Sequence, residues 1–94
     1  MTPALPDVTH DASSQNFTCA VDGQRCVLDY VLLGTTMTIT HTGVPAAVGG
    51  RGIASALTLA AMDTARREGW QVVPACSYAA LWLRRHPDYA HLQA

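Results

Sequence analysis

The alternation of apolar and polar residues in the first half of the chain predicts β-strands. Residues 16–21 alternate with their larger apolar members on one face, as half-buried strands do. Asp22-Gly23 comes next and predicts a tight hairpin turn. Two further apolar runs, 26–33 and 37–41, are separated by Gly34-Thr35. The pattern therefore predicts three consecutive antiparallel strands.

In the second half of the chain the hydrophobic period becomes helical. Apolar residues recur at three- and four-residue spacing over 53–68, and Gly69 suits the left-handed residue that ends many helices. The short apolar run 70–73 predicts a fourth strand that ends at Pro74. Residues 78–85 are rich in alanine and leucine and predict a second helix.

The order βββαβα predicts an α/β protein of the α+β type. We expect a mainly antiparallel sheet of about four strands that carries two helices. Residues 1–15 lack apolar periodicity and contain two prolines, so we expect a flexible leader there. Residues 16–94 then form a single domain, because 94 residues suffice for one modest core.

Composition narrows the class of protein. The net charge is −1 and no lysine is present, so we expect no continuous basic surface and no nucleic-acid partner. Three cysteines do not form a secreted disulfide framework, and no set of Cys, His and acidic residues has metal-ligand spacing. No signal sequence or apolar stretch of membrane-spanning length occurs. We therefore predict a cytoplasmic protein with neither a metal nor a membrane partner.

A turn with three glycines, Gly49-Gly50-Arg51-Gly52, joins the third strand to the first helix. Glycines let the main chain approach an anion closely, and the unpaired N–H groups of a helix start favour phosphate oxygens. Arg51 adds a bidentate donor. A close-packed loop that needs positive φ angles explains the same glycines equally well. A nucleoside triphosphate loop is excluded, because its motif requires a lysine.

Three segments resemble one known family. The run HTGVPAAVGGRGIASAL, which begins at His41, resembles a segment of the Gcn5-related N-acetyltransferase superfamily, in particular of its miniature YjdJ-like group. Residues 74–78 and 86–89 agree with the same group, so that the resemblance spans residues 16–92. It implies a reduced acetyltransferase (GNAT-like) fold and the use of acetyl-CoA, with coenzyme A as product.

The resemblance also implies which residues bind the cofactor. In the superfamily the pattern Arg/Gln-x-x-Gly-x-Gly/Ala binds the pyrophosphate, and Gly52 and Ala54 match its last two positions. Gly49 replaces the usual Arg or Gln, so we expect Arg51 to substitute for it, and Gly43 stands where relatives often carry an acid. The expected cofactor-binding set is Val44, Gly49, Gly50, Arg51, Gly52, Ile53, Ala54, Ser55 and Tyr78.

Acetyl transfer to an amine needs a base and a group that stabilises the leaving thiolate. His41 ends the strand that leads into the turn, and its ordinary pKa suits a general base. A strand-end histidine bonded to the backbone is the alternative. Cys76 precedes the second helix, where a lowered pKa makes it an acyl acceptor or an acid, although free cysteines are commonly buried apolar residues. Tyr78 is either a proton donor or a ring packed on the sheet.

These observations predict an acetyl-CoA-dependent N-acetyltransferase with His41 and Cys76 as catalytic residues. The acceptor is an unidentified amine, either a small molecule or a peptide. The alternative is a coenzyme A or acyl-CoA-binding module without turnover. We expect a monomer, with a weak dimer as the alternative because a small sheet leaves a strand edge exposed.

Overall fold

A five-stranded sheet forms the centre of the structure, a computed structural model that describes residues 7–94. The strands lie side by side in chain order. Adjacent strands are antiparallel except the last two, which are parallel. The strands are β1 (Thr9–Asp11), β2 (Asn16–Val21), β3 (Gln24–Leu33), β4 (Thr36–Gly43) and β5 (Gln71–Pro74).

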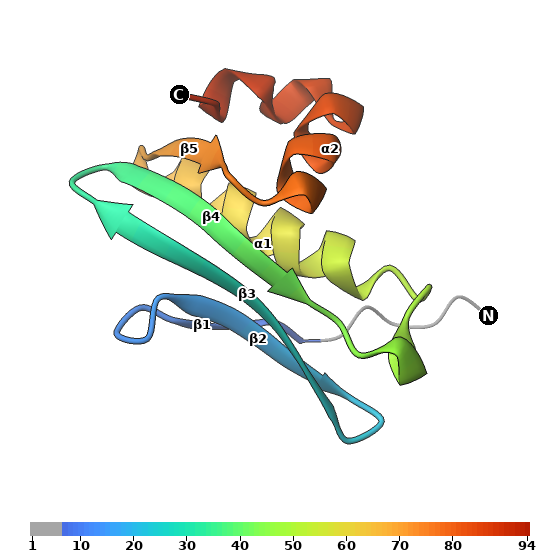
Figure 1. Ribbon diagram of the computed structural model, residues 1–94. Coiled ribbons are helices and arrows are strands. Elements are labelled where there is room, and N and C mark those ends of the chain that lie inside the picture. The colour runs from blue at the N-terminus through green and yellow to red at the C-terminus, as the bar shows by residue number, and fades with distance from the viewer. Residues whose placement is uncertain (1–6) are drawn as a thin grey trace.

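Helices connect and follow the last two strands. A short 3-10 turn, η1 (Ala46–Val48), and the long helix α1 (Ile53–Glu68) form the crossover from β4 to β5. The helix α2 (Ser77–Arg85) and the 3-10 segment η2 (Pro87–Leu92) follow. Figure 1 shows α1 along the sheet and α2 beyond β5, near the C-terminus. The predicted α+β class, with a mainly antiparallel sheet and two helices, is therefore confirmed.

Strand alternation places the core on one face of the sheet. In β3, Cys26, Leu28 and Tyr30 are buried, whereas Val31 and Leu33 are exposed. Leu57, Ala61, Met62 and Ala65 of α1 are fully buried in the same cluster. Within residues 7–94, helices cover this core face alone, and the opposite face of the sheet is open.

The sheet begins earlier than the sequence predicts. Thr9–Asp11, inside the segment predicted as a leader, forms β1 at the edge of β2. The ring of His10 stacks on Phe17 at a centroid distance of 4.2 Å, and its Nε2 lies 2.6 Å from the Tyr30 hydroxyl. These contacts come from distant residues, which explains why local composition did not reveal the strand. The first six residues of the predicted leader lie outside the described residues.

Two other strands extend past their predicted bounds. β3 starts at Gln24, and β4 runs from Thr36 to Gly43 rather than from 37 to 41. Ladder hydrogen bonds to a neighbouring strand continue past the last large apolar residue, so hydrophobicity underestimates strand length. The extension matters for function, because it brings Thr42 and Gly43 into the strand that leads to the glycine turn.

The C-terminal segment closes the far edge of the sheet. Tyr89 and Leu92 are buried, and the Tyr89 hydroxyl donates to Asp63 of α1 at 2.7 Å. Gln93 forms a parallel bridge with Val72, so part of the outer edge of β5 is covered by the same chain.

Candidate functional site

The turn between β4 and α1 holds its shape through a buried anchor and two local hydrogen bonds. Val48 is buried, and its amide donates to the carbonyl of Pro45 at 3.0 Å. The amide of Gly49 donates to Ala46 at 3.1 Å, so Gly49 is tied into η1. Gly50 and Gly52 have φ angles of 77° and 76°, a left-handed conformation that side chains disfavour.

The amides that follow point away from the protein's own acceptors. The first bond at the start of α1 runs from the amide of Ala56 to the carbonyl of Gly52 at 3.0 Å. Within residues 7–94, the six amides of 50–55 donate to no backbone or side-chain acceptor. The first turn of α1 contains no acidic residue that would compete for these donors. This helix start therefore presents a positive, unsatisfied group of donors.

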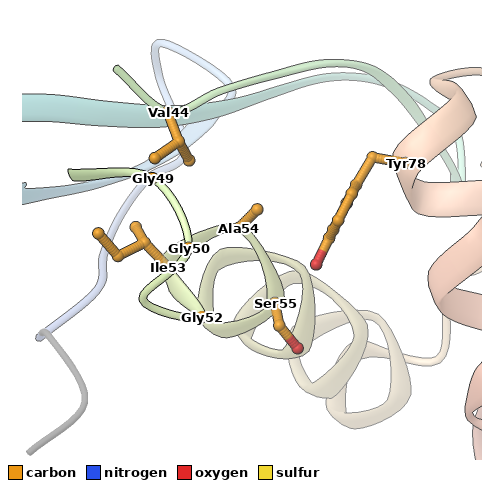
Figure 2. A pocket seen from close by; sticks show the side chains of 8 residues that line it. All are labelled: Val44, Gly49, Gly50, Gly52, Ile53, Ala54, Ser55 and Tyr78. Atoms are coloured by element: carbon orange, nitrogen blue, oxygen red, sulfur yellow. The ribbon is translucent and has the colours of Figure 1, made fainter. Parts of the chain in front are cut away.

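A cavity of about 240 Å³ lies directly at this helix start. Figure 2 shows the glycine turn on one side and Tyr78, reaching across from α2, on the other. A Cβ built on Gly50 or Gly52 would meet no atom within 4 Å, so the main chain there faces open space. The residues that line the cavity are Val44, Gly49, Gly50, Gly52, Ile53, Ala54, Ser55 and Tyr78.

Next to the turn, β4 and β5 separate. Their parallel pairing ends at Ile39 and Pro74, and the carbonyl of Ile39 accepts from the amide of Cys76 at 2.9 Å. Thr40 has no partner in β3, because the register shifts there, and such a bulge bends and twists a strand. Residues 40–43 therefore extend beyond β5 as a strand end with a free side.

Cys76 lies at this separation, immediately before α2. Its Sγ is 3.7 Å from the Thr42 hydroxyl oxygen, and the residue is partly buried. Burial alone raises the pKa of the thiol, but the backbone amides of Ala79, Tyr78 and Thr42 and the Thr42 hydroxyl more than offset burial. The net result is a lowered pKa. Cys76 thus resembles the thiols that helix starts activate, whereas burial raises the pKa of Cys19.

Comparison with known proteins identifies the family of the chain. A family model described as "GCN5-related N-acetyl-transferase" matches residues 16–92. The chain belongs to this family. Protein NATD1 of Xenopus tropicalis is 36% identical over 89 residues, which cover 92% of this chain and 82% of that protein. Protein NATD1 of Homo sapiens is 35% identical and shares 92% and 79% of the two chains.

A solved structure supports the fold. The NMR structure of a GCN5-like protein from Staphylococcus aureus matches with a TM-score of 0.74, covering 98% of this chain and 91% of that one. The sequences are 21% identical, so the match bears on the fold. It confirms the reduced acetyltransferase (GNAT-like) fold that the sequence predicts.

Most residues expected to bind the cofactor of this family lie together at the cavity. All of them line it except Arg51. Arg51 instead forms an ion pair with Asp22 of the β2–β3 turn at 2.7 Å, and both side chains are more than half exposed. The expected replacement for the missing Arg or Gln is therefore held by another partner in this structure.

His41 lies on the opposite face of the sheet. Leu28 pairs with Thr42 and is in the core, whereas Asp29 pairs with His41, so these two residues face the open side. The Nε2 atom of His41 lies 3.0 Å from the position that a Cβ on Gly43 would take. The imidazole thus extends over Gly43 toward the end of β4. A side chain at position 43 would require the ring to shift by a few tenths of an ångström.

Tyr78 combines two of the expected arrangements. Its ring packs against the core cluster, and its side chain also lines the cavity opposite Ala54 and Ser55. Ser55 accepts a hydrogen bond from the indole N–H of Trp82 at 3.0 Å, which fixes α2 against the first turn of α1. Sequence analysis did not single out Thr42, Asp22 or Trp82 for the site. The only feature of the sequence that could have pointed to Thr42 is its position next to His41 as a polar residue.

The described part of the chain shows neither a metal site nor a membrane-spanning helix. Residues 7–94 contain no group of three or more His, Cys, Asp or Glu side chains arranged to hold a metal ion. Among the helices of the same residues, none has the length and apolar character required to cross a membrane.

Proposed function

We propose that this protein binds acetyl-CoA through its diphosphate at the start of α1 and transfers the acetyl group to an amine. The observation that carries the proposal is the run of six amides, from Gly50 to Ser55, without an acceptor among residues 7–94, beside a cavity. Phosphate oxygens satisfy such donors, and the helix dipole adds to the attraction. Membership of the GCN5-related family supports the same ligand.

The separation of β4 and β5 fits the rest of that ligand. The pantetheine arm of coenzyme A is an extended chain with two amide groups. Residues 40–43 of β4 have no β5 partner, so their free side is suited to an extended amide chain that adds to the sheet. The arm would then lead from the cavity past Val44 toward Thr42 and Cys76.

The residues at this separation suit the transfer. When bound, acetyl-CoA supplies an acetyl group whose carbonyl carbon bonds to the amine nitrogen as the carbon–sulfur bond breaks. In our proposal, His41 accepts the proton that the amine loses. The helices cover the core face of the sheet, so the amine approaches from the open face, where His41 lies. Cys76 either donates a proton to the departing thiolate or accepts the acetyl group itself.

Calorimetric titration with coenzyme A tests the binding step. Gly52 and Gly69 cap the two ends of α1, with φ angles of 76° and 75°, and a Cβ at either meets no atom within 4 Å. Gly52→Ala and Gly69→Ala therefore impose a similar backbone strain of about 1 kcal/mol. We expect Gly52→Ala to weaken binding at least about tenfold and Gly69→Ala to leave it unchanged. Equal affinities would contradict a diphosphate site at this turn.

Transfer is tested with labelled acetyl-CoA and a simple primary amine. We expect His41→Ala to lower the rate about 100-fold, as loss of a general base does. Cys76→Ala is expected to lower the rate and to abolish any label on the protein. The catalytic assignment fails if both variants transfer acetyl at the wild-type rate.

A second candidate is a coenzyme A-binding protein without turnover. It is favoured by the position of His41, which does not line the described cavity, and by the pairing of Arg51 with Asp22. Under this reading coenzyme A binds and Gly52→Ala weakens it, but labelled acetyl-CoA is recovered intact with every amine tested.

A further inference from the structure

A second hollow adjoins the cavity at the start of α1. Its volume is about 200 Å³, and it shares Ser55 and Tyr78 with the first cavity. Its remaining walls come from the outer side and the end of α2. The residues that line it are Ser55, Tyr78, Leu81, Trp82, Arg85 and His86. The two hollows thus continue from the glycine turn toward the C-terminal end of α2.

The side chains that line the second hollow are held in place by contacts with one another. The rings of Trp82 and His86 stack with a centroid distance of 3.7 Å and an angle of 12°. The Nδ1 atom of His86 lies 2.7 Å from the carbonyl oxygen of Trp82, and the indole N–H donates to Ser55. These polar groups are therefore occupied, and Trp82 is only 3% exposed. The apolar side chains that remain accessible in the hollow are those of Tyr78 and Leu81.

Arg85 differs from the other groups around this hollow. Among the described residues its guanidinium forms no ion pair, as is also true of Arg25 and Arg84, whereas Arg51, Arg66 and Arg67 are paired. The side chain is exposed at the last turn of α2 and borders the hollow. The cationic group available to a ligand here is Arg85.

The ligand of the proposed function carries a second anionic group that the helix start does not satisfy. Besides its diphosphate, coenzyme A has a phosphate on the 3′ oxygen of its adenosine. Arg51, the cation nearest in sequence to the turn, is paired with Asp22. The reactive end of the ligand belongs near Cys76, before the first residue of α2. Arg85 is eight residues beyond Ser77, about 12 Å along the helix axis.

We propose that the hollow at the end of α2 binds the adenosine 3′-phosphate of coenzyme A, with Arg85 as the contact to the phosphate. The proposal rests on the proposed function and extends it to a second anion site. The purine lies against the wall formed by Tyr78 and Leu81. A guanidinium is suited to this role because its planar donors match two phosphate oxygens.

A pair of ligands that differ in one phosphate tests the proposal. Coenzyme A and 3′-dephospho-coenzyme A are titrated by calorimetry against wild-type protein, Arg85→Gln and Arg84→Gln. The two variants lose the same charge from the same helix turn, but Arg84 does not border the hollow. We expect the wild type and Arg84→Gln to bind coenzyme A about tenfold more tightly than its dephospho form. Arg85→Gln should bind both ligands with the same affinity, close to that of the wild type for dephospho-coenzyme A.

The outcomes of this experiment distinguish the 3′-phosphate site from the diphosphate site of the proposed function. If wild-type protein binds both ligands equally, or if Arg85→Gln keeps the preference for coenzyme A, the 3′-phosphate site is wrong while the diphosphate site stands. If neither ligand binds wild-type protein, both proposals are wrong. Equal melting temperatures of Arg85→Gln and Arg84→Gln show that the two variants are equally folded.

Discussion

The two α-helices among residues 7–94 begin in different ways, although Tyr78 of α2 and the first turn of α1 line the same cavity. α1 has Gly52 as its N-cap, and within residues 7–94 its first amides have no acceptor. α2 has Cys76 as its N-cap, and the Cys76 side chain forms no capping hydrogen bond. The amide of Cys76 itself donates to Ile39 of β4.

The difference shows how one physical property can serve two purposes. A helix start always presents unpaired N–H groups and the positive end of a dipole. At α2 the amides of Tyr78 and Ala79 help to lower the pKa of Cys76, although the sulfur forms no capping hydrogen bond. At α1 the first amides have no acceptor among residues 7–94, so they remain available to an outside anion. Tyr78 connects the two helix starts, because it belongs to the first turn of α2 and also lines the cavity at the start of α1.

An internal anion at the start of α1 should remove this difference. Ala54→Asp places a carboxylate in the first turn, where it can occupy the amides in place of phosphate. We expect coenzyme A affinity to fall at least about 100-fold, because like charges a few ångströms apart repel strongly near a protein surface. The free energy of unfolding at neutral pH should instead rise by about 0.5 kcal/mol through the helix dipole. Calorimetric titration and urea unfolding measure the two effects.

Ala54→Asn is the matched control for that experiment. It adds a side chain of similar size without charge, and therefore separates obstruction of the cavity from electrostatic competition. If the Asn and Asp variants bind coenzyme A equally weakly, the cavity is sensitive to size alone, and the open helix start has no special affinity for anions.

The start of α2 is tested by the reactivity of its thiol. Because its pKa is lowered, Cys76 should react with iodoacetamide at neutral pH more than about tenfold faster than Cys19, which is buried and has a raised pKa. Mass spectrometry of the modified peptides measures both rates. Thr42→Val removes one group that lowers the pKa, so the pH midpoint for Cys76 should move upward. A midpoint that does not move would exclude Thr42 as a cause.

The same shift has a consequence for stability. Folding lowers the pKa of Cys76, so its thiolate stabilises the fold above the pKa that the thiol has in the unfolded chain. That contribution is lost as the pH falls through the folded-state pKa. The difference in free energy of unfolding between wild type and Cys76→Ala should therefore grow as the pH rises through the folded-state pKa up to the ordinary thiol pKa of 9.0. A difference independent of pH would indicate an ordinary buried thiol.

The contrast between the helix starts also explains what could be predicted from the sequence. The start of α1 is local: Gly50 and Gly52 are near neighbours, and their backbone angles alone expose the amides that follow. The sequence alone therefore predicts the glycine turn and most of the residues that line the cavity beside it. Hydrophobic periodicity was similarly sufficient for α1 and for three of the strands, since it acts over a few residues.

The missing parts of the prediction depend on contacts between distant residues. β1 forms because His10 meets Phe17 and Tyr30, and its own three residues are all exposed. The ion pair that holds Arg51 needs Asp22, which is 29 positions away. The face on which His41 lies is set by a register shift between β3 and β4 that no local pattern encodes. Local rules thus located the turn but not the partners of its side chains.

The smallest expected effect concerns the cation beside the open helix start. Asp22→Asn removes the partner of Arg51, and asparagine tolerates the positive φ of 51° at this position. Exposed ion pairs contribute little, so the free energy of unfolding should change by less than about 1 kcal/mol. A released Arg51 becomes available to the diphosphate, and we expect coenzyme A affinity to rise about threefold. If affinity rises in Asp22→Asn but not in Asp22→Asn combined with Arg51→Gln, the gain belongs to Arg51. If the affinity for coenzyme A falls instead, the ion pair between Arg51 and Asp22 helps to hold the shape of the turn. The anion site then depends on this ion pair as well as on the amides.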